Sequence, residues 1–94
     1  MKGLKWLPEA RDDLRRLYDF IAPHSPDAAS RAVETLLTAA ETLLEFPEKG
    51  RPWEVERGGR ELQVRFGVRG YVIRYRLFED RIFIMRVWHG LERR

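Results

Sequence analysis

The residues of this chain that could do chemistry are arginines, a few acids and one well-placed histidine. Ten arginines and no lysine lie in residues 57–94 beside four acids, so this segment has a net charge of +6, whereas residues 1–56 carry −3. Arginine's planar fork suits carboxylates and phosphates better than lysine does. The asymmetry predicts a cationic surface that meets an anionic partner. The alternative is that these arginines only cover the solvent-exposed face of a sheet whose other face is buried.

Other kinds of chemistry have little support in the sequence. There is no cysteine, and the two isolated histidines, His24 and His89, are too few to predict a metal site. No glycine-rich phosphate loop or nucleophile motif is present, so no cofactor is predicted. His89 follows the last apolar run, where histidine can act as an acid or a base or simply cap the sheet through a hydrogen bond. His24 lies between two prolines and reads as a loop residue.

Two amphipathic helices should come first. Pro8 suits the first position of a helix, and Ser25-Pro26-Asp27 gives an N-cap, a first-turn proline and an acid. Apolar residues then recur at helical spacing in both stretches. Because few residues separate them, residues 8–46 predict an antiparallel helical hairpin.

Residues 47–59 read as a loop, and residues 60–89 as an antiparallel sheet of alternating strands. Trp53 in the loop is expected to cover the edge of the core, with ligand stacking as the alternative. The run 81–88 is apolar on both faces, which predicts the central strand, with Phe83, Met85 and Val87 sharing a face. A weak alternation at residues 3–7 offers a further strand. The open face should carry Arg65, Arg74 and Arg76, with Arg86 as a further candidate.

The predicted fold is therefore α+β: an N-terminal helical hairpin packed on one face of a three- to four-stranded, mainly antiparallel sheet. Residues 1–94 suit a single domain. No apolar run is long enough for a membrane span, and residues 1–13 lack the apolar segment of a secretory signal. With no cysteine, the chain is compatible with a reducing compartment, and we expect it to be cytoplasmic.

Several motifs, in order along nearly the whole chain, resemble the RelE/ParE superfamily of bacterial type II toxins. They include Trp6, Ala10, Asp13 and Leu14, residues 18–21, 25–29, 46–52, 60–62, 70–76 and 86–90. The resemblance implies a growth-arresting toxin that a cognate antitoxin neutralises with an acidic, partly disordered segment. An arginine-rich sheet flanked by apolar residues suits such a segment. The expected antitoxin contacts are Arg65, Arg74, Arg76, Arg86 and Trp88.

The superfamily divides by target: ParE-like members inhibit DNA gyrase, and RelE-like members cleave mRNA on the ribosome. The chain looks more like the ParE branch, because Val72 and Gln63 stand where RelE-type ribonucleases carry cations. Gyrase inhibition, without enzymatic activity, is therefore the prediction. In the alternative, a metal-independent mRNA endoribonuclease, the expected catalytic residues are His89, Glu61, Arg65, Arg74, Arg86 and Arg93.

A third possibility is a non-toxic module that binds nucleic acid. Basic strands with interleaved aromatic residues can stack single-stranded bases. Tyr71 and Tyr75, however, share a strand face with Ile73 and Leu77, so they should point into the core. This possibility is therefore the weakest of the three.

Overall fold

The helical hairpin forms as predicted in the computed structural model, which describes residues 3–92. Helix α1 spans Pro8–Ile21 and α2 spans Pro26–Glu41, and a short 3-10 turn, Thr42–Leu44, follows α2. Pro8 and Pro26 open the two helices, and Ser25 Oγ accepts a hydrogen bond from the Ala28 N–H at 3.1 Å. None of the helices within these residues has the length and apolarity to cross a membrane.

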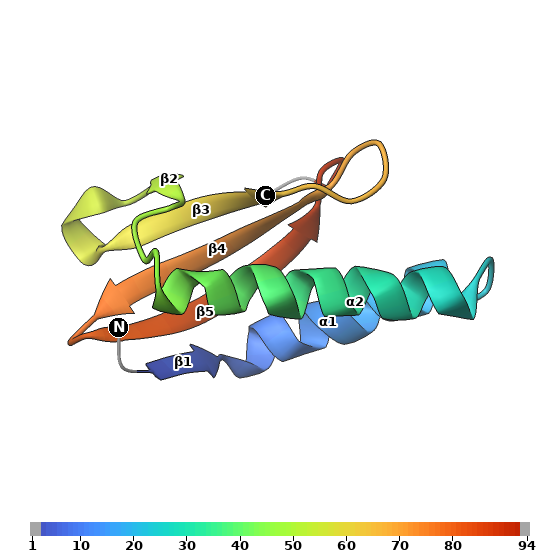
Figure 1. Ribbon diagram of the computed structural model, residues 1–94, viewed down its shortest axis with the longest axis horizontal. Coiled ribbons are helices and arrows are strands. Elements are labelled where there is room, and N and C mark those ends of the chain that lie inside the picture. The colour runs from blue at the N-terminus through green and yellow to red at the C-terminus, as the bar shows by residue number, and fades with distance from the viewer. Residues whose placement is uncertain (1–2, 93–94) are drawn as a thin grey trace.

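The sheet has five strands in the order β1-β5-β4-β3-β2 (Figure 1). Their bounds are Gly3–Trp6, Arg51–Pro52, Gly59–Val64, Tyr71–Phe78 and Arg81–His89 for β1 to β5. Strand β1 runs parallel to β5, and all other pairs are antiparallel. The weak alternation at residues 3–7 therefore does form a strand, and the predicted loop 47–59 contributes the two-residue β2 and a 3-10 turn, Val55–Arg57. The mainly antiparallel α+β architecture is confirmed, with more strands than expected.

Two predictions about the last strand are wrong. The central strand is β4, because β1 pairs with the outer side of β5. In addition, Arg74 pairs with Arg86 but Tyr75 pairs with Ile84, which leaves Met85 as an extra residue in β5. This β-bulge reverses the alternation. Strict alternation fails here, and Ile82, Ile84 and Val87 are the β5 residues that enter the core.

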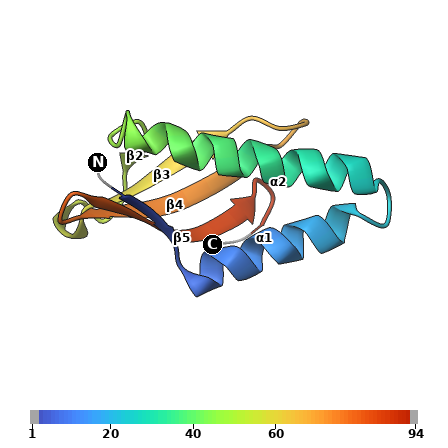
Figure 2. The same cartoon turned by 60° about the horizontal axis from the view of Figure 1, so that its bottom comes forward.

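Both helices cover one face of the sheet. Figure 2 shows α1 on the β5 side and α2 on the β3 side, in agreement with their contacts. The core between the layers is almost entirely aliphatic, apart from Tyr71 and Tyr75. The Tyr75 hydroxyl is buried, donates to the Pro47 carbonyl at 2.7 Å and accepts from the Gly50 N–H at 2.9 Å. A Cβ at Gly50 would lie 2.7 Å from that hydroxyl, so this tyrosine fixes the loop before β2.

The β4–β5 hairpin turn stores backbone strain that can be tested. Glu79 and Asp80 both have positive φ, 48° and 64°, in a two-residue turn where Asn-Gly is the favoured pair. We expect Asp80→Gly to raise the free energy of unfolding by about 1 kcal/mol, because glycine adopts this conformation without a Cβ penalty. Asp80→Val should lower it. Chemical denaturation measures both, and equal stability of the two variants would contradict the account.

Candidate interaction site

The open face of the sheet holds the arginines in internal contacts. Arg74 donates two hydrogen bonds to one Glu61 oxygen, at 2.9 and 2.6 Å, and Glu61 is only 4% exposed. The Arg74 guanidinium also lies 3.5 Å from the centroid of the Trp53 ring and 4.8 Å from that of Trp88. This stacking between two indoles adds cation–π attraction to the ion pair. Trp53 thus stacks on Arg74 on the open face of the sheet, and it is not among the residues that pack against the core, where the sequence had placed it.

Arg76 and Trp88 are also engaged. Arg76 Nη2 lies 3.7 Å from Glu54, its side chain is 25% exposed, and its buried Nε has no hydrogen-bond partner among the described residues. Trp88 is 7% exposed, beneath Arg74 and Arg86. Arg65 differs from the other arginines that were predicted on the open face. It is exposed, and it has no ion pair with any of the described residues.

Arg86 reaches across the sheet edge to Asp13 on α1. Strand β1 ends at Trp6 opposite Ile84, so the outer edge of β5 has no strand partner beyond that point. The Asp13 carboxylate binds this uncovered edge. It accepts hydrogen bonds from the Val87 N–H at 2.8 Å and from Arg86 Nε and Nη2 at 2.8 and 3.1 Å. A side-chain carboxylate thus replaces the missing strand.

The electrostatics of this contact favour the ionised acid. Burial raises the pKa of Asp13, but hydrogen bonds from Arg86, the Val87 N–H and Arg16 outweigh it and hold the pKa below its usual value. In turn, the bond to Asp13 raises the pKa of Arg86 above its usual value, against the opposing effect of burial.

Arg16 links the same helix to the C-terminal turn. Its guanidinium donates to Asp13, to the Val87 carbonyl at 3.2 Å and to the Glu92 carboxylate. Burial lowers the pKa of Arg16, yet the bonds to Glu92 and Asp13 raise it overall. Glu92 also accepts from the His89 N–H at 3.1 Å. The turn after β5 is therefore held against α1.

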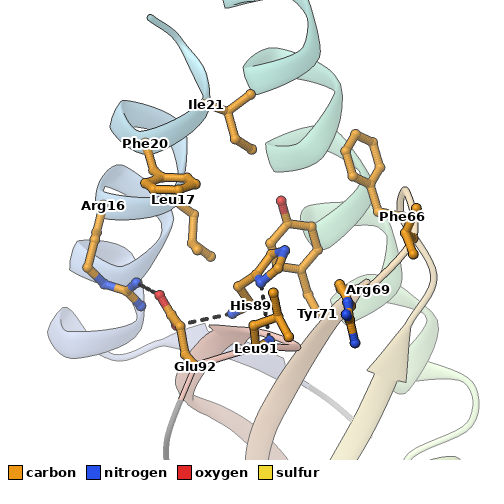
Figure 3. A pocket seen from close by; sticks show the side chains of 11 residues that line it. Arg16, Leu17, Phe20, Ile21, Phe66, Arg69, Tyr71, His89, Leu91 and Glu92 are labelled. Carbon is orange, nitrogen blue, oxygen red and sulfur yellow. Dashed lines mark hydrogen bonds and ion pairs between the residues drawn. The ribbon is translucent and has the colours of Figure 1, made fainter. Parts of the chain in front are cut away.

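That turn closes one wall of an apolar groove of about 680 Å³ (Figure 3). The second half of α1 forms the wall next to this turn, and Phe66 and Arg69 of the β3–β4 loop lie across the groove from α1. The exposed apolar side chains at the groove include Phe20, 74% exposed, and Leu91, 63% exposed. Arg16 and Arg69 lie at its border, while Tyr71 and Phe66 line it with Leu17, Ile21, Val68, His89 and Glu92. Apolar surface bordered by charge is typical of a protein-binding site.

His89 lies in this groove, on the helix-covered face of the sheet. Its ring meets that of Tyr71 edge-on at 5.6 Å, and its Nδ1 accepts from the Leu91 N–H at 3.2 Å. Burial, with a smaller effect of the Glu92 charge, raises the pKa of Tyr71. The residues expected for a nuclease are thus separated: Glu61 is on the open face, Arg86 is at the edge, and Arg93 lies outside the described residues. No cluster of metal-ligating side chains occurs within residues 3–92.

Sequence reasoning missed the residues that build the groove, above all Asp13, Arg16, Phe20 and Glu92. One signal was available, because Asp13 falls on the apolar stripe of α1, three residues after the buried Ala10 and four before the buried Leu17. An acid on an apolar helix face is buried only if it has partners. The identity of those partners, 73 and 74 residues further along the chain, could not be read from the spacing.

Comparison with known proteins agrees with this fold. Residues 4–94 match the family described as ParE toxin of type II toxin-antitoxin system, parDE. "Toxin RelE3" of Caulobacter vibrioides is 40% identical over the full length of both chains, and "Toxin RelE1" of the same organism is 40% identical over 90% of this chain and 89% of its own. A solved structure titled "Chromosomal ParDE TA system from P. aeruginosa" superposes with a TM-score of 0.77 at 28% identity, covering 95% of this chain and 96% of that one.

The fold and the family match together define a small α+β toxin. The chain belongs to the ParE toxin family, within the RelE/ParE toxins that its sequence resembles. It is the toxin component of a type II toxin–antitoxin system, and its partner is a cognate antitoxin.

The Asp13 contact makes a quantitative prediction. Asp13→Ala leaves the Val87 N–H and the Arg86 fork without their partner, so we expect the free energy of unfolding at pH 7 to fall by about 3 kcal/mol. The neighbouring Asp12 is exposed, and Asp12→Ala should change it by less than about 0.5 kcal/mol. Urea denaturation of the two variants checks this.

The same pair predicts the pH dependence. The pKa of Asp13 is lower in the folded than in the unfolded chain. Its contribution to the free energy of unfolding is therefore fully present at pH values above the pKa in the unfolded chain, near 4, and is lost as the pH falls through the pKa in the folded chain. The difference between wild type and Asp13→Ala should therefore shrink below about pH 4. A difference at pH 2 as large as that at pH 7 would show that the carboxylate's charge is not what stabilises the fold.

Proposed function

We propose that this toxin arrests growth by binding and inhibiting DNA gyrase. The observation that carries this proposal is the placement of the acid–base candidates Glu61 and His89 on opposite faces of the sheet. Glu61 pairs in register with Arg74 on the open face, whereas His89 pairs with Tyr71, whose side chain lies in the core. Tyr71 and Arg74 are three residues apart on β4, or about 10 Å along the strand.

The contacts of these residues also favour binding over cleavage. RNA cleavage without a metal needs a base, an acid and cations around one phosphate. Glu61 is buried and bonded to Arg74, Arg86 is bonded to Asp13, and the Nδ1 of His89 already accepts from Leu91. A single phosphate cannot contact both Glu61 and His89 across the sheet. An exposed apolar groove, in contrast, is typical of protein recognition.

The alternative is ribosome-dependent mRNA cleavage, which is favoured by the RelE names of the Caulobacter relatives. Two assays on purified toxin separate the two functions. Inhibition of gyrase supercoiling without cleavage of mRNA on translating ribosomes is the expected outcome. Cleavage without gyrase inhibition would replace the proposal with the alternative.

A variant of His89 sharpens this test. We expect His89→Ala to remain toxic, so that the inducer concentration that arrests growth changes by less than about tenfold, because the proposed activity needs no proton transfer. In a nuclease, loss of a general acid or base would lower the rate of cleavage by about 10²–10⁴-fold. Since His89 also lines the groove, gyrase affinity is measured alongside growth. Loss of toxicity with gyrase binding intact would contradict the proposal.

We further propose that the antitoxin binds in the apolar groove. The antitoxin contacts expected from the sequence at Arg74, Arg76, Arg86 and Trp88 stay a prediction, but these side chains are already engaged within the sheet. The groove, with the exposed Phe20 and Leu91 and with Arg69 at its border, offers apolar area and a positive rim. An acidic amphipathic segment matches both properties.

The groove proposal predicts the effect of one exposed side chain. Phe20→Glu should weaken antitoxin affinity at least about tenfold, because it puts a charge into the apolar contact. Phe78 is similarly exposed, at 58%, but lies at the β4–β5 turn, so Phe78→Glu is the matched control and should leave the affinity unchanged. Isothermal titration measures both, and equal effects of the two changes would exclude the groove as the docking surface.

A further inference from the structure

Two pairs of adjacent leucines occur in α2 and in the 3-10 turn that follows it. The pairs, Leu36-Leu37 and Leu43-Leu44, are seven residues apart, so their corresponding members lie on the same side of the helix. Leu36 and Leu43 are 0% exposed and belong to the core, whereas Leu37 and Leu44 are 38% and 37% exposed. Packing of α2 onto the sheet therefore needs only the first leucine of each pair.

Phe46 continues the exposed apolar surface beyond the 3-10 turn. Its side chain is 58% exposed. No residue of α2 is among the described residues that line the apolar groove, and Figure 1 shows α2 in front of the sheet, with no other described segment in front of it. The side chains of Leu37, Leu44 and Phe46 thus form a second exposed apolar surface, which we call the α2 surface.

The charge around the α2 surface is opposite to that at the groove. Residues 32–48 contain no basic residue in a chain whose net charge is +3, and they contain four acids: Glu34, Glu41, Glu45 and Glu48. All four are exposed, and none has an ion pair with a described residue. Glu34 and Glu41 lie beside Leu37, because they are three and four residues from it on the helix. The groove, in contrast, has Arg16 and Arg69 at its border.

This charge selects the kind of partner. The α2 surface repels an acidic segment, and it also repels the phosphates of nucleic acids and of anionic membranes. Two copies of this chain that paired symmetrically through α2 would bring the same carboxylates face to face. The matching partner is therefore a protein surface that has basic side chains around an apolar centre.

We propose that the toxin binds DNA gyrase through the α2 surface, against a basic protein surface of that enzyme. This inference rests on the proposed inhibition of gyrase, and it assigns gyrase and the antitoxin to different surfaces of the toxin. Leu37 and Phe46 supply the apolar contact, and Glu34 and Glu41 pair with basic side chains of gyrase around it. The acidic antitoxin segment binds in the groove, whose border is positive.

The affinity of the purified toxin for gyrase of the same organism, measured by surface plasmon resonance, tests this inference. Leu37→Lys should weaken gyrase binding at least about tenfold, because it puts a positive charge opposite basic side chains, and it should leave antitoxin affinity unchanged. Phe20→Glu in the groove should keep gyrase affinity. Wild-type gyrase affinity of Leu37→Lys would overturn the α2 surface as the contact and leave gyrase inhibition standing. Failure of the wild-type toxin to bind gyrase would overturn both.

Reversal of one charge provides a second measurement. Glu41→Lys should weaken gyrase binding at least about fivefold, and more at low than at high salt, because salt screens the attraction. Glu56→Lys changes the net charge equally but lies in the 3-10 turn Val55–Arg57, so it is the matched control and should bind as the wild type does. Equal affinities of the two variants would overturn the assignment. Circular dichroism checks the fold, and Glu41→Lys decides the question if Leu37→Lys does not fold.

Discussion

The structure depends most on one buried carboxylate, that of Asp13. It satisfies the Val87 N–H where β1 stops covering β5, and it holds Arg86 and Arg16 at the same edge. Helix α1 and the last strand, far apart in the sequence, are joined there by charge-assisted hydrogen bonds, which are stronger than neutral ones. Arg16 continues the contact to the turn after β5, and that turn forms a wall of the groove. The shape of the groove therefore depends on an acid in the first helix.

Internal ion pairs also change what the high arginine content means. The sequence suggests an open cationic sheet, yet Arg74 and Arg86 neutralise the two buried acids, Glu61 and Asp13, and Arg76 lies near Glu54. These arginines mainly allow acids to be buried at the sheet, because an unpaired buried charge is very costly. The surface that we propose for recognition of the antitoxin is the apolar groove. Net charge predicted an anionic partner, but it did not locate the contact surface.

Most of the fold could be read from the sequence, because helical spacing, caps and strand alternation are local patterns. The hairpin and the three long strands follow from them. Strand β2 could not be predicted, because its two residues are ordered by the buried Tyr75 hydroxyl, which binds the backbone at Pro47 and Gly50. The candidate site was only partly visible: His89 was singled out, but its neighbours Phe20 and Glu92 were not, since nothing local links them.

The sequence alone determined the class of the protein: two amphipathic helices, alternating strands and a set of motifs that identify a toxin family. The tertiary structure decided which side chains are available. The bulge at Met85 reverses the alternation of β5 and brings Ile82 and Ile84 into the core, and the two faces of the sheet separate Glu61 from His89. The physical reason is that periodicity specifies how a segment folds by itself. Pairing between distant strands and helices determines which charges are neutralised and which surfaces stay open.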